Sequence, residues 1–110
     1  MKILLIRPPA KYFKGTSPPA IDLPLGIMYI GSVLRNTGYV VQIYDALVKV
    51  NVSSRKTMLS SGHFGASWKE IEGVVKNEKP DIVGIANQFT SQLENAIQTA
   101  EIIKKTNKKY

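Results

Sequence analysis

Three short apolar runs, each followed by a longer stretch with helical periodicity, dominate the hydropathy pattern of the chain. The runs are Ile3–Ile6, Val40–Tyr44 and Ile82–Ala86. The first and third are continuously apolar rather than alternating, which is typical of strands buried on both faces of a parallel sheet. The pattern therefore predicts three β-strands, each followed by a helix.

Proline, glycine and helix-capping residues mark where the three helices begin and end. Pro24 suits the first turn of the first helix, and Gly38 supplies the left-handed residue that ends it. Ser67–Glu70 and Ser91–Glu94 have the spacing of capping boxes that start the second and third helices, and Lys79-Pro80 stops the second. The predicted buried faces are Ile27, Ile30, Val33 and Leu34 in the first helix, Trp68, Ile71, Val74 and Val75 in the second, and Leu93, Ala96, Ile97, Ala100 and Ile103 in the third.

This order of elements predicts an α/β fold. Strand–helix units in succession give right-handed crossovers and a parallel sheet with helices on both sides, in a Rossmann-like (flavodoxin-like) three-layer arrangement. A doubly wound domain normally continues to a fourth and fifth strand, and three strands leave both sheet edges open. We expect a fragment truncated after three βα units, with self-association through an open edge as the alternative.

Length and composition narrow the class further. The chain has 110 residues, enough for one domain, and no cysteine. Disulfides, thiolate zinc sites, cysteine nucleophiles and cysteine-ligated iron–sulfur clusters are therefore excluded from it. Its apolar runs are far shorter than the roughly 20 residues that cross a bilayer, and its start does not read as a signal peptide. We expect a cytoplasmic protein without a membrane partner.

The net charge of +7 is concentrated in residues 1–56 and in four lysines near the end, Lys104, Lys105, Lys108 and Lys109. A basic chain attracts nucleic acid and other phosphate-rich partners. Lysines at the end of a helix also complement the helix dipole and are ordinarily solvated. We favour the second interpretation, because no aromatic residue is interleaved with the lysines as single-strand binders prefer.

No complete catalytic set is visible. The Gly-x-Gly-x-x-Gly and Gly-Lys-Ser/Thr motifs are absent, and Arg7 stands where a receiver domain would carry acidic residues. His63, the only histidine, fits a solvated loop side chain better than a ligand or general base. Asp45, at the end of the second strand, occupies the usual place of a ribose-binding acid, and it fits a turn-forming residue equally well.

Two connections, residues 7–23 and 46–66, are longer than sheet geometry requires, and such loops bind ligands in this architecture. The candidate site pairs Pro24-Leu25-Gly26 with Thr90-Ser91, because both groups follow strands that flank one crevice in the flavodoxin-like order. Gly26 would let a flat ligand approach, and Thr90 and Ser91 offer hydroxyls. Alternatively, Gly26 serves helix packing and Ser91 only caps a helix. The spacing of these residues alone does not decide between the two interpretations.

Several segments in order resemble a known family. They are Met1–Pro9, Leu23–Tyr39, Phe64–Ile71 and Pro80–Ile85. Together they resemble the amino-terminal cobalamin-binding domain of cobalamin-dependent radical S-adenosylmethionine enzymes, from Met1 to about Lys105. The resemblance implies that residues 1–110 form the amino-terminal part (βαβαβα) of that domain. It implies that the chain binds cobalamin above the carboxyl ends of the strands and is joined to a carboxyl-terminal radical domain, which carries S-adenosylmethionine and a 4Fe-4S cluster.

The resemblance also implies site residues. Pro24, Leu25 and Gly26 would lie beside the corrin, and Thr90 and Ser91 near its dimethylbenzimidazole tail. Leu23 stands where the related methionine synthase type has a cobalt-ligating histidine, so no ligand is implied there. Ala86 replaces a frequent serine, and the second half of the domain, with its Gly-Gly loop, is absent from the sequence.

The function expected from the resemblance is a cobalamin-binding module of a methyltransferase or cyclase, without a catalytic residue or metal ligand of its own. The alternative is a basic interaction domain for nucleic acid or another phosphate-rich partner. A hydrolase or transferase half-domain on the same fold is the least favoured interpretation, because fold alone does not imply function.

Overall fold

The computed structural model describes residues 1–11, 22–48 and 62–110. Its central sheet has three parallel strands in the order β3-β1-β5. Their bounds are Lys2–Arg7 for β1, Val40–Asp45 for β3 and Ile82–Ile85 for β5. The three predicted strands and their parallel pairing are confirmed, and the first predicted strand lies in the middle, as in the flavodoxin-like order.

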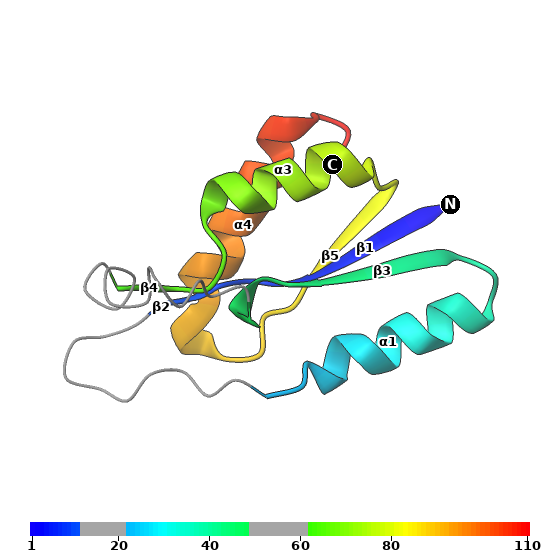
Figure 1. Ribbon diagram of the computed structural model, residues 1–110, viewed down its shortest axis with the longest axis horizontal. Coiled ribbons are helices and arrows are strands. Elements are labelled where there is room, and N and C mark those ends of the chain that lie inside the picture. Colours follow the sequence, from blue (N-terminus) through cyan, green and yellow to red (C-terminus); the bar gives the residue numbers. More distant parts are fainter. Residues whose placement is uncertain (12–21, 49–61) are drawn as a thin grey trace.

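Helices cover both faces of the sheet (Figure 1). Helix α1 (Leu25–Asn36) packs on one face against β1 and β3, and helices α3 (Trp68–Glu78) and α4 (Leu93–Thr106) pack together on the other. The fold is therefore a three-layer, Rossmann-like α/β arrangement, as predicted. A 3-10 turn, η1 (Ala46–Val48), follows β3, and a second one, η3 (Thr90–Gln92), precedes α4.

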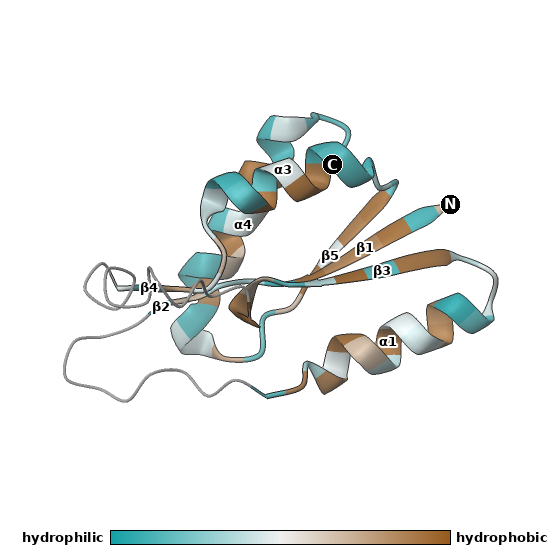
Figure 2. Ribbon diagram, viewed as in Figure 1, coloured by the Kyte–Doolittle hydropathy of each residue, from teal (hydrophilic) through white to brown (hydrophobic). Residues whose placement is uncertain are grey.

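The core divides at the sheet into two layers. Ile3 and Leu5 of β1 point toward α1 and contact Ile27, while Leu4 and Ile6 point toward α3 and α4. The brown middle of β1 in Figure 2, between its hydrophilic ends, shows this central strand to be apolar on both faces. Burial on both faces of the sheet therefore explains, as predicted, why the first apolar run is continuous rather than alternating.

The start and end of α3 and the end of α1 follow their predicted signals. The hydroxyl of Ser67 accepts a hydrogen bond from the Glu70 amide at 3.1 Å, and Lys79 adopts a left-handed conformation after the last turn of α3. Gly38 takes φ of +97° just beyond α1, which only glycine adopts without strain.

Two predictions of burial were wrong. Ile30 and Val33 of α1 are 54% and 64% exposed, because α1 lies over β3 and β1 and contacts the sheet through Ile27 and Gly31. Leu93 and Ile97 of α4 are likewise exposed. In both helices the apolar stripe is wider than the surface that the described residues offer to cover it.

A second, antiparallel sheet was not predicted. It pairs β2 (Ala10–Lys11) with β4 (His63–Phe64), and so joins the segments that flank the two long connections. Much of these connections, residues 12–21 and 49–61, lies outside the described residues. A strand of two residues carries no recognisable periodicity, which explains why the sequence pattern gave no sign of it.

Candidate functional site

The candidate site lies at the carboxyl edge of the main sheet. Because β1 and β5 are parallel neighbours, the segment that precedes α1 and the segment that precedes α4 leave the sheet at the same edge. Figure 1 shows both segments at this end of the molecule, on the side opposite the amino terminus. Carboxyl ends of neighbouring parallel strands are where this architecture binds ligands.

An ion-pair network of Arg7, Asp45 and Asp22 fixes one side of this edge. At the end of β1, Arg7 donates from Nε to Asp45 Oδ1 at 2.7 Å and from its second terminal nitrogen to Asp45 Oδ2 at 2.5 Å. The guanidinium also reaches Asp22, with its carboxylate at 2.9 Å and its backbone oxygen at 2.8 Å. The network therefore connects the ends of two strands to the segment that enters α1.

Burial of the Arg7 guanidinium lowers its pKa, but the hydrogen bonds and charges of Asp45 and Asp22 more than offset this and hold the pKa above its ordinary value. Arg7 is thus a permanent cation whose charge is balanced locally. Asp45 also accepts a hydrogen bond from the Leu47 amide at 3.1 Å, so its carboxylate shapes the turn after β3. Hydrogen bonds from Arg7 and Leu47 already occupy both carboxylate oxygens of Asp45. A contact between Asp45 and a ligand therefore stays a prediction.

Pro24, Leu25 and Gly26 form the entrance to α1. Pro24 immediately precedes the helix, and Leu25 is its exposed first residue. At Gly26 a Cβ atom would meet no atom within 4 Å, so this glycine is not required by helix packing within the described residues. The packing alternative for Gly26 is therefore not supported, and an open approach to the start of α1 remains.

Thr90 and Ser91 lie in η3 rather than at the first turn of α4. The capping box predicted for Ser91 and Glu94 is not formed: Gln92 occupies the cap position, and no side chain caps α4 there. Both hydroxyl-bearing residues are exposed. Ser91 is thus free of the capping role that was its alternative explanation.

Exposed apolar side chains accompany these residues. Leu23 and Leu25 stand before α1, and Phe89 and Leu93 flank η3. Each of the four is more than 40% exposed. An apolar rim beside small and hydroxyl residues suits a ligand with a broad apolar face and polar substituents.

Side-chain amides on the other rim were missed by sequence reasoning. Gln92 receives the Lys11 amide on Oε1 at 2.7 Å, and its Nε2 donates to the Lys11 oxygen at 3.3 Å. Buried Asn95 donates to the Pro9 oxygen at 2.7 Å. The signal that could have found this rim is Asn95 with Thr99, a pair of polar residues at helical spacing on a buried helix face.

His63 is a structural residue rather than a solvated one. Its Nε2 lies 2.7 Å from the Ala66 oxygen, and its ring meets Trp68 edge to face at a centroid distance of 5.2 Å. Lys104 and Lys105 lie in the last turn of α4, where they complement the helix dipole, whereas Lys108 and Lys109 follow the end of the helix. In the part of the chain that the structure describes, no group of His, Cys, Asp and Glu side chains is arranged to hold a metal ion. No helix there has the length and apolar character needed to span a bilayer.

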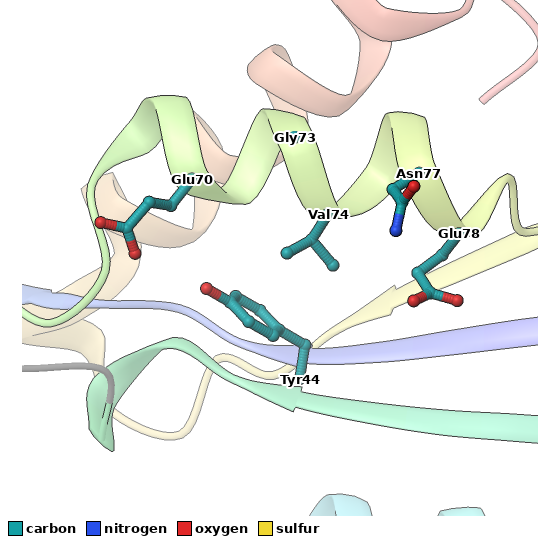
Figure 3. Close-up of a pocket in the computed structure, with 6 residues that line it drawn as sticks. All are labelled: Tyr44, Glu70, Gly73, Val74, Asn77 and Glu78. Carbon is teal, nitrogen blue, oxygen red and sulfur yellow. The ribbon is translucent and has the colours of Figure 1, made fainter.

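A shallow cavity of about 630 Å³ lies elsewhere, between α3 and the outer edge of β3 (Figure 3). Tyr44 forms its floor, while Glu70 and Glu78 reach into it from α3. Burial raises the pKa of Tyr44, and the charge of Glu70 adds to the effect. None of the predicted cofactor residues lines this acidic cavity, so it is separate from the candidate site.

Comparison with known proteins points to one class of enzyme. The chain is 33% identical over 96 residues, or 86% of its length, to a cytidylyl-2-hydroxyethylphosphonate methyltransferase of Streptomyces wedmorensis. It is 32% identical over 111 aligned positions, or 97% of its length, to an uncharacterized methyltransferase of Pyrococcus horikoshii. These matches cover 18% and 20% of the two enzymes.

No protein-family model and no solved structure matches the chain. The relation to known proteins therefore rests on sequence similarity to these two enzymes. The homologues of this chain are methyltransferases, and it spans about one fifth of the length of each of the two curated ones described here.

Proposed function

We propose that this chain is the cobalamin-binding module of a methyltransferase of the radical S-adenosylmethionine class. The observation that carries the proposal is the adjacency of β1 and β5, which brings the entrance to α1 and the η3 turn to one edge of the sheet. The methyltransferase homologues support the enzyme class, and the family resemblance of the sequence supports the cofactor.

The residues at this edge fit a corrinoid. The space beside Gly26 is open, which a flat macrocycle needs for close approach to the start of α1. Exposed Leu25 and Phe89 offer apolar contact, and the hydroxyls of Thr90 and Ser91 offer hydrogen bonds to a polar tail. When bound, the corrinoid supplies methyl-transfer chemistry at its cobalt.

The chain's own residues would hold and orient the cofactor. Arg7 fixes the backbone of Asp22, and this sets the position of the next residues, Leu23 and Pro24, before α1. The side chain of Leu23 has no atom able to ligate cobalt, so this residue would contribute apolar contact rather than a metal ligand.

Binding of hydroxocobalamin tests the proposal. The protein is mixed with excess hydroxocobalamin and passed through a gel-filtration column, and retained corrinoid is read from its visible absorbance. Gly26→Leu should reduce retention, because its side chain fills the open space beside α1. Gly73→Leu is the matched control, since Gly73 is also a helical glycine without an atom within 4 Å of its Cβ position.

The outcomes separate the cofactor from its location. If only the Gly26 variant loses corrinoid, the result supports both the cofactor assignment and its location beside α1. Equal retention in the two variants would place the corrinoid elsewhere. If neither the chain nor the longer protein that contains it retains corrinoid, the cofactor assignment is wrong.

A further inference from the structure

The segment that follows β1, residues 7–11, is attached to both halves of the candidate site. It runs from the end of β1 through Pro8 and Pro9 into β2 (Figure 1). A proline ring fixes one backbone dihedral angle, so two prolines in succession leave the chain little freedom. Pro9 is fully buried and Ala10 is buried as well. Residues 7–11 are therefore a stiff support at the carboxyl edge of the sheet.

Arg7, at the start of this support, holds the entrance to α1. Its guanidinium donates hydrogen bonds to the carboxylate of Asp22 at 2.9 Å and to the backbone oxygen of Asp22 at 2.8 Å. Asp22 lies two residues before Pro24, which immediately precedes the helix. The first half of the site is thus attached to residues 7–11 through one side chain.

Two side-chain amides attach the second half of the site to the same support. Gln92 accepts a hydrogen bond from the Lys11 N–H on Oε1 at 2.7 Å and donates from Nε2 to the Lys11 oxygen at 3.3 Å. Asn95, which is 7% exposed, donates to the Pro9 oxygen at 2.7 Å. All three bonds end on backbone atoms of residues 7–11, so they fix the start of α4 against this segment.

Gln92 belongs to the same short turn as the hydroxyl-bearing residues of the site. Turn η3 spans Thr90–Gln92, and the N–H of Gln92 donates to the Phe89 oxygen at 3.0 Å. Short 3-10 turns have poor hydrogen-bond geometry, and no side chain caps the start of α4. The contact between Gln92 and Lys11 therefore contributes strongly to where Thr90 and Ser91 lie.

We propose that Gln92 is a positioning residue of the corrinoid site, an inference that rests on the proposed function. By holding η3 on residues 7–11, it sets the place of Thr90 and Ser91 relative to the entrance to α1. Gln92 acts without touching the ligand. Loss of its hydrogen bonds lowers the fraction of molecules in which both halves of the site are in place, and the apparent affinity falls with that fraction.

The corrinoid affinity of Gln92→Ala tests this role. The dissociation constant for hydroxocobalamin is measured by titration of visible absorbance, in the chain or in the longer protein that contains it. We expect Gln92→Ala to weaken binding about three- to tenfold, which corresponds to the loss of about one net hydrogen bond.

Thr106→Ala is the matched control. It also removes a hydrogen bond from a side chain to a backbone oxygen, from Thr106 to Ile103 at 2.7 Å, but at the opposite end of α4 from η3. Its corrinoid affinity should equal that of the unchanged protein. Urea unfolding of both variants verifies that each is folded under the conditions of the titration.

Amide hydrogen exchange, measured by NMR without corrinoid, gives a second readout. In Gln92→Ala the protection of the backbone N–H groups of residues 92 and 93 should fall about three- to tenfold, whereas amides in the middle of α4 keep theirs. Thr106→Ala should leave the protection of residues 92 and 93 unchanged.

The outcomes separate this role from the cofactor assignment. If the protein binds corrinoid, unchanged affinity in Gln92→Ala would overturn the positioning role, and so would an equal loss of affinity in Thr106→Ala, because stability alone would then explain both. If the protein retains no corrinoid, the proposed function is wrong. The exchange rates then decide by themselves whether Gln92 positions η3, and unchanged protection at residues 92 and 93 refutes it.

Discussion

Replacing Asp45 by asparagine measures how strongly the Arg7 network supports the carboxyl edge of the sheet. The side chains of Arg7 and Asp45 are only 11% and 14% exposed. Removing one partner of a buried ion pair costs about 3 to 5 kcal/mol, because the other charge stays buried without compensation. Asp22 still contacts the guanidinium, so we expect Asp45→Asn to lower the free energy of unfolding by about 2 to 3 kcal/mol.

Asp22→Asn is the matched control for this change. It makes the same chemical substitution on a partner of the same guanidinium, but the Asp22 side chain is 71% exposed. Exposed ion pairs contribute about 0.2 to 1 kcal/mol, so the expected loss is below about 1 kcal/mol. The backbone oxygen of Asp22 keeps its hydrogen bond to Arg7 in this variant.

Urea unfolding at neutral pH, followed by the fluorescence of Trp68, gives both values. Trp68 is the only tryptophan of the chain and packs against His63, so its emission reports the folded state. If the two substitutions lower the free energy of unfolding by the same amount, burial does not decide the strength of this network, and the reasoning fails.

Two further changes test backbone strain and pH dependence. Gly65→Ala should destabilise the fold by more than about 3 kcal/mol, because φ is +120° and a Cβ would lie 2.5 Å from a backbone oxygen. Gly73→Ala, inside α3 with no atom within 4 Å, should stabilise it by about 0.5 to 1 kcal/mol, and urea unfolding compares the two. The hydrogen bond from Lys2 holds the pKa of Glu78 below its ordinary value of 4.5. This contribution to stability is present above pH 4.5 and lost as the pH falls through the lowered value, so Lys2→Met should flatten the acid dependence seen in unfolding curves. An unchanged dependence in that variant would contradict this cause.

The main sheet could be predicted because its signals are local and repeated. Continuous hydropathy in Ile3–Ile6 and the capping hydroxyl of Ser67 each report one element without knowledge of its neighbours. Burial of helix faces was harder, because it depends on what covers them. Ile30 and Ile97 have the correct helical spacing, yet both are exposed, since no described element packs over them.

The candidate site divides in the same way. The positions of Gly26 and Thr90 in the sequence were enough to predict that both lie at one edge of the sheet, because strand order follows from the βα pattern. The partner of Asp45 was not foreseen, since the hydrogen bond from Arg7 joins residues 38 positions apart and has no sequence pattern. The failure of the Ser91 cap has a similar origin: the chain enters α4 through η3, a turn that a capping motif does not encode.

The side chain of Gln92 imitates a peptide group. One amide oxygen and one amide nitrogen satisfy both backbone groups of Lys11, on a strand whose pairing partner in the sheet is β4. Strand β2 is therefore hydrogen-bonded to β4 and, at Lys11, to the side chain of Gln92, which takes the place of a further strand. Because the bond is made to backbone, side-chain identity at position 11 is unconstrained by it, whereas glutamate at position 92 would forfeit a donor. Homologous sequences should therefore retain an amide at position 92, whereas the Lys11 side chain is held separately, by an ion pair to Glu94 at 3.0 Å.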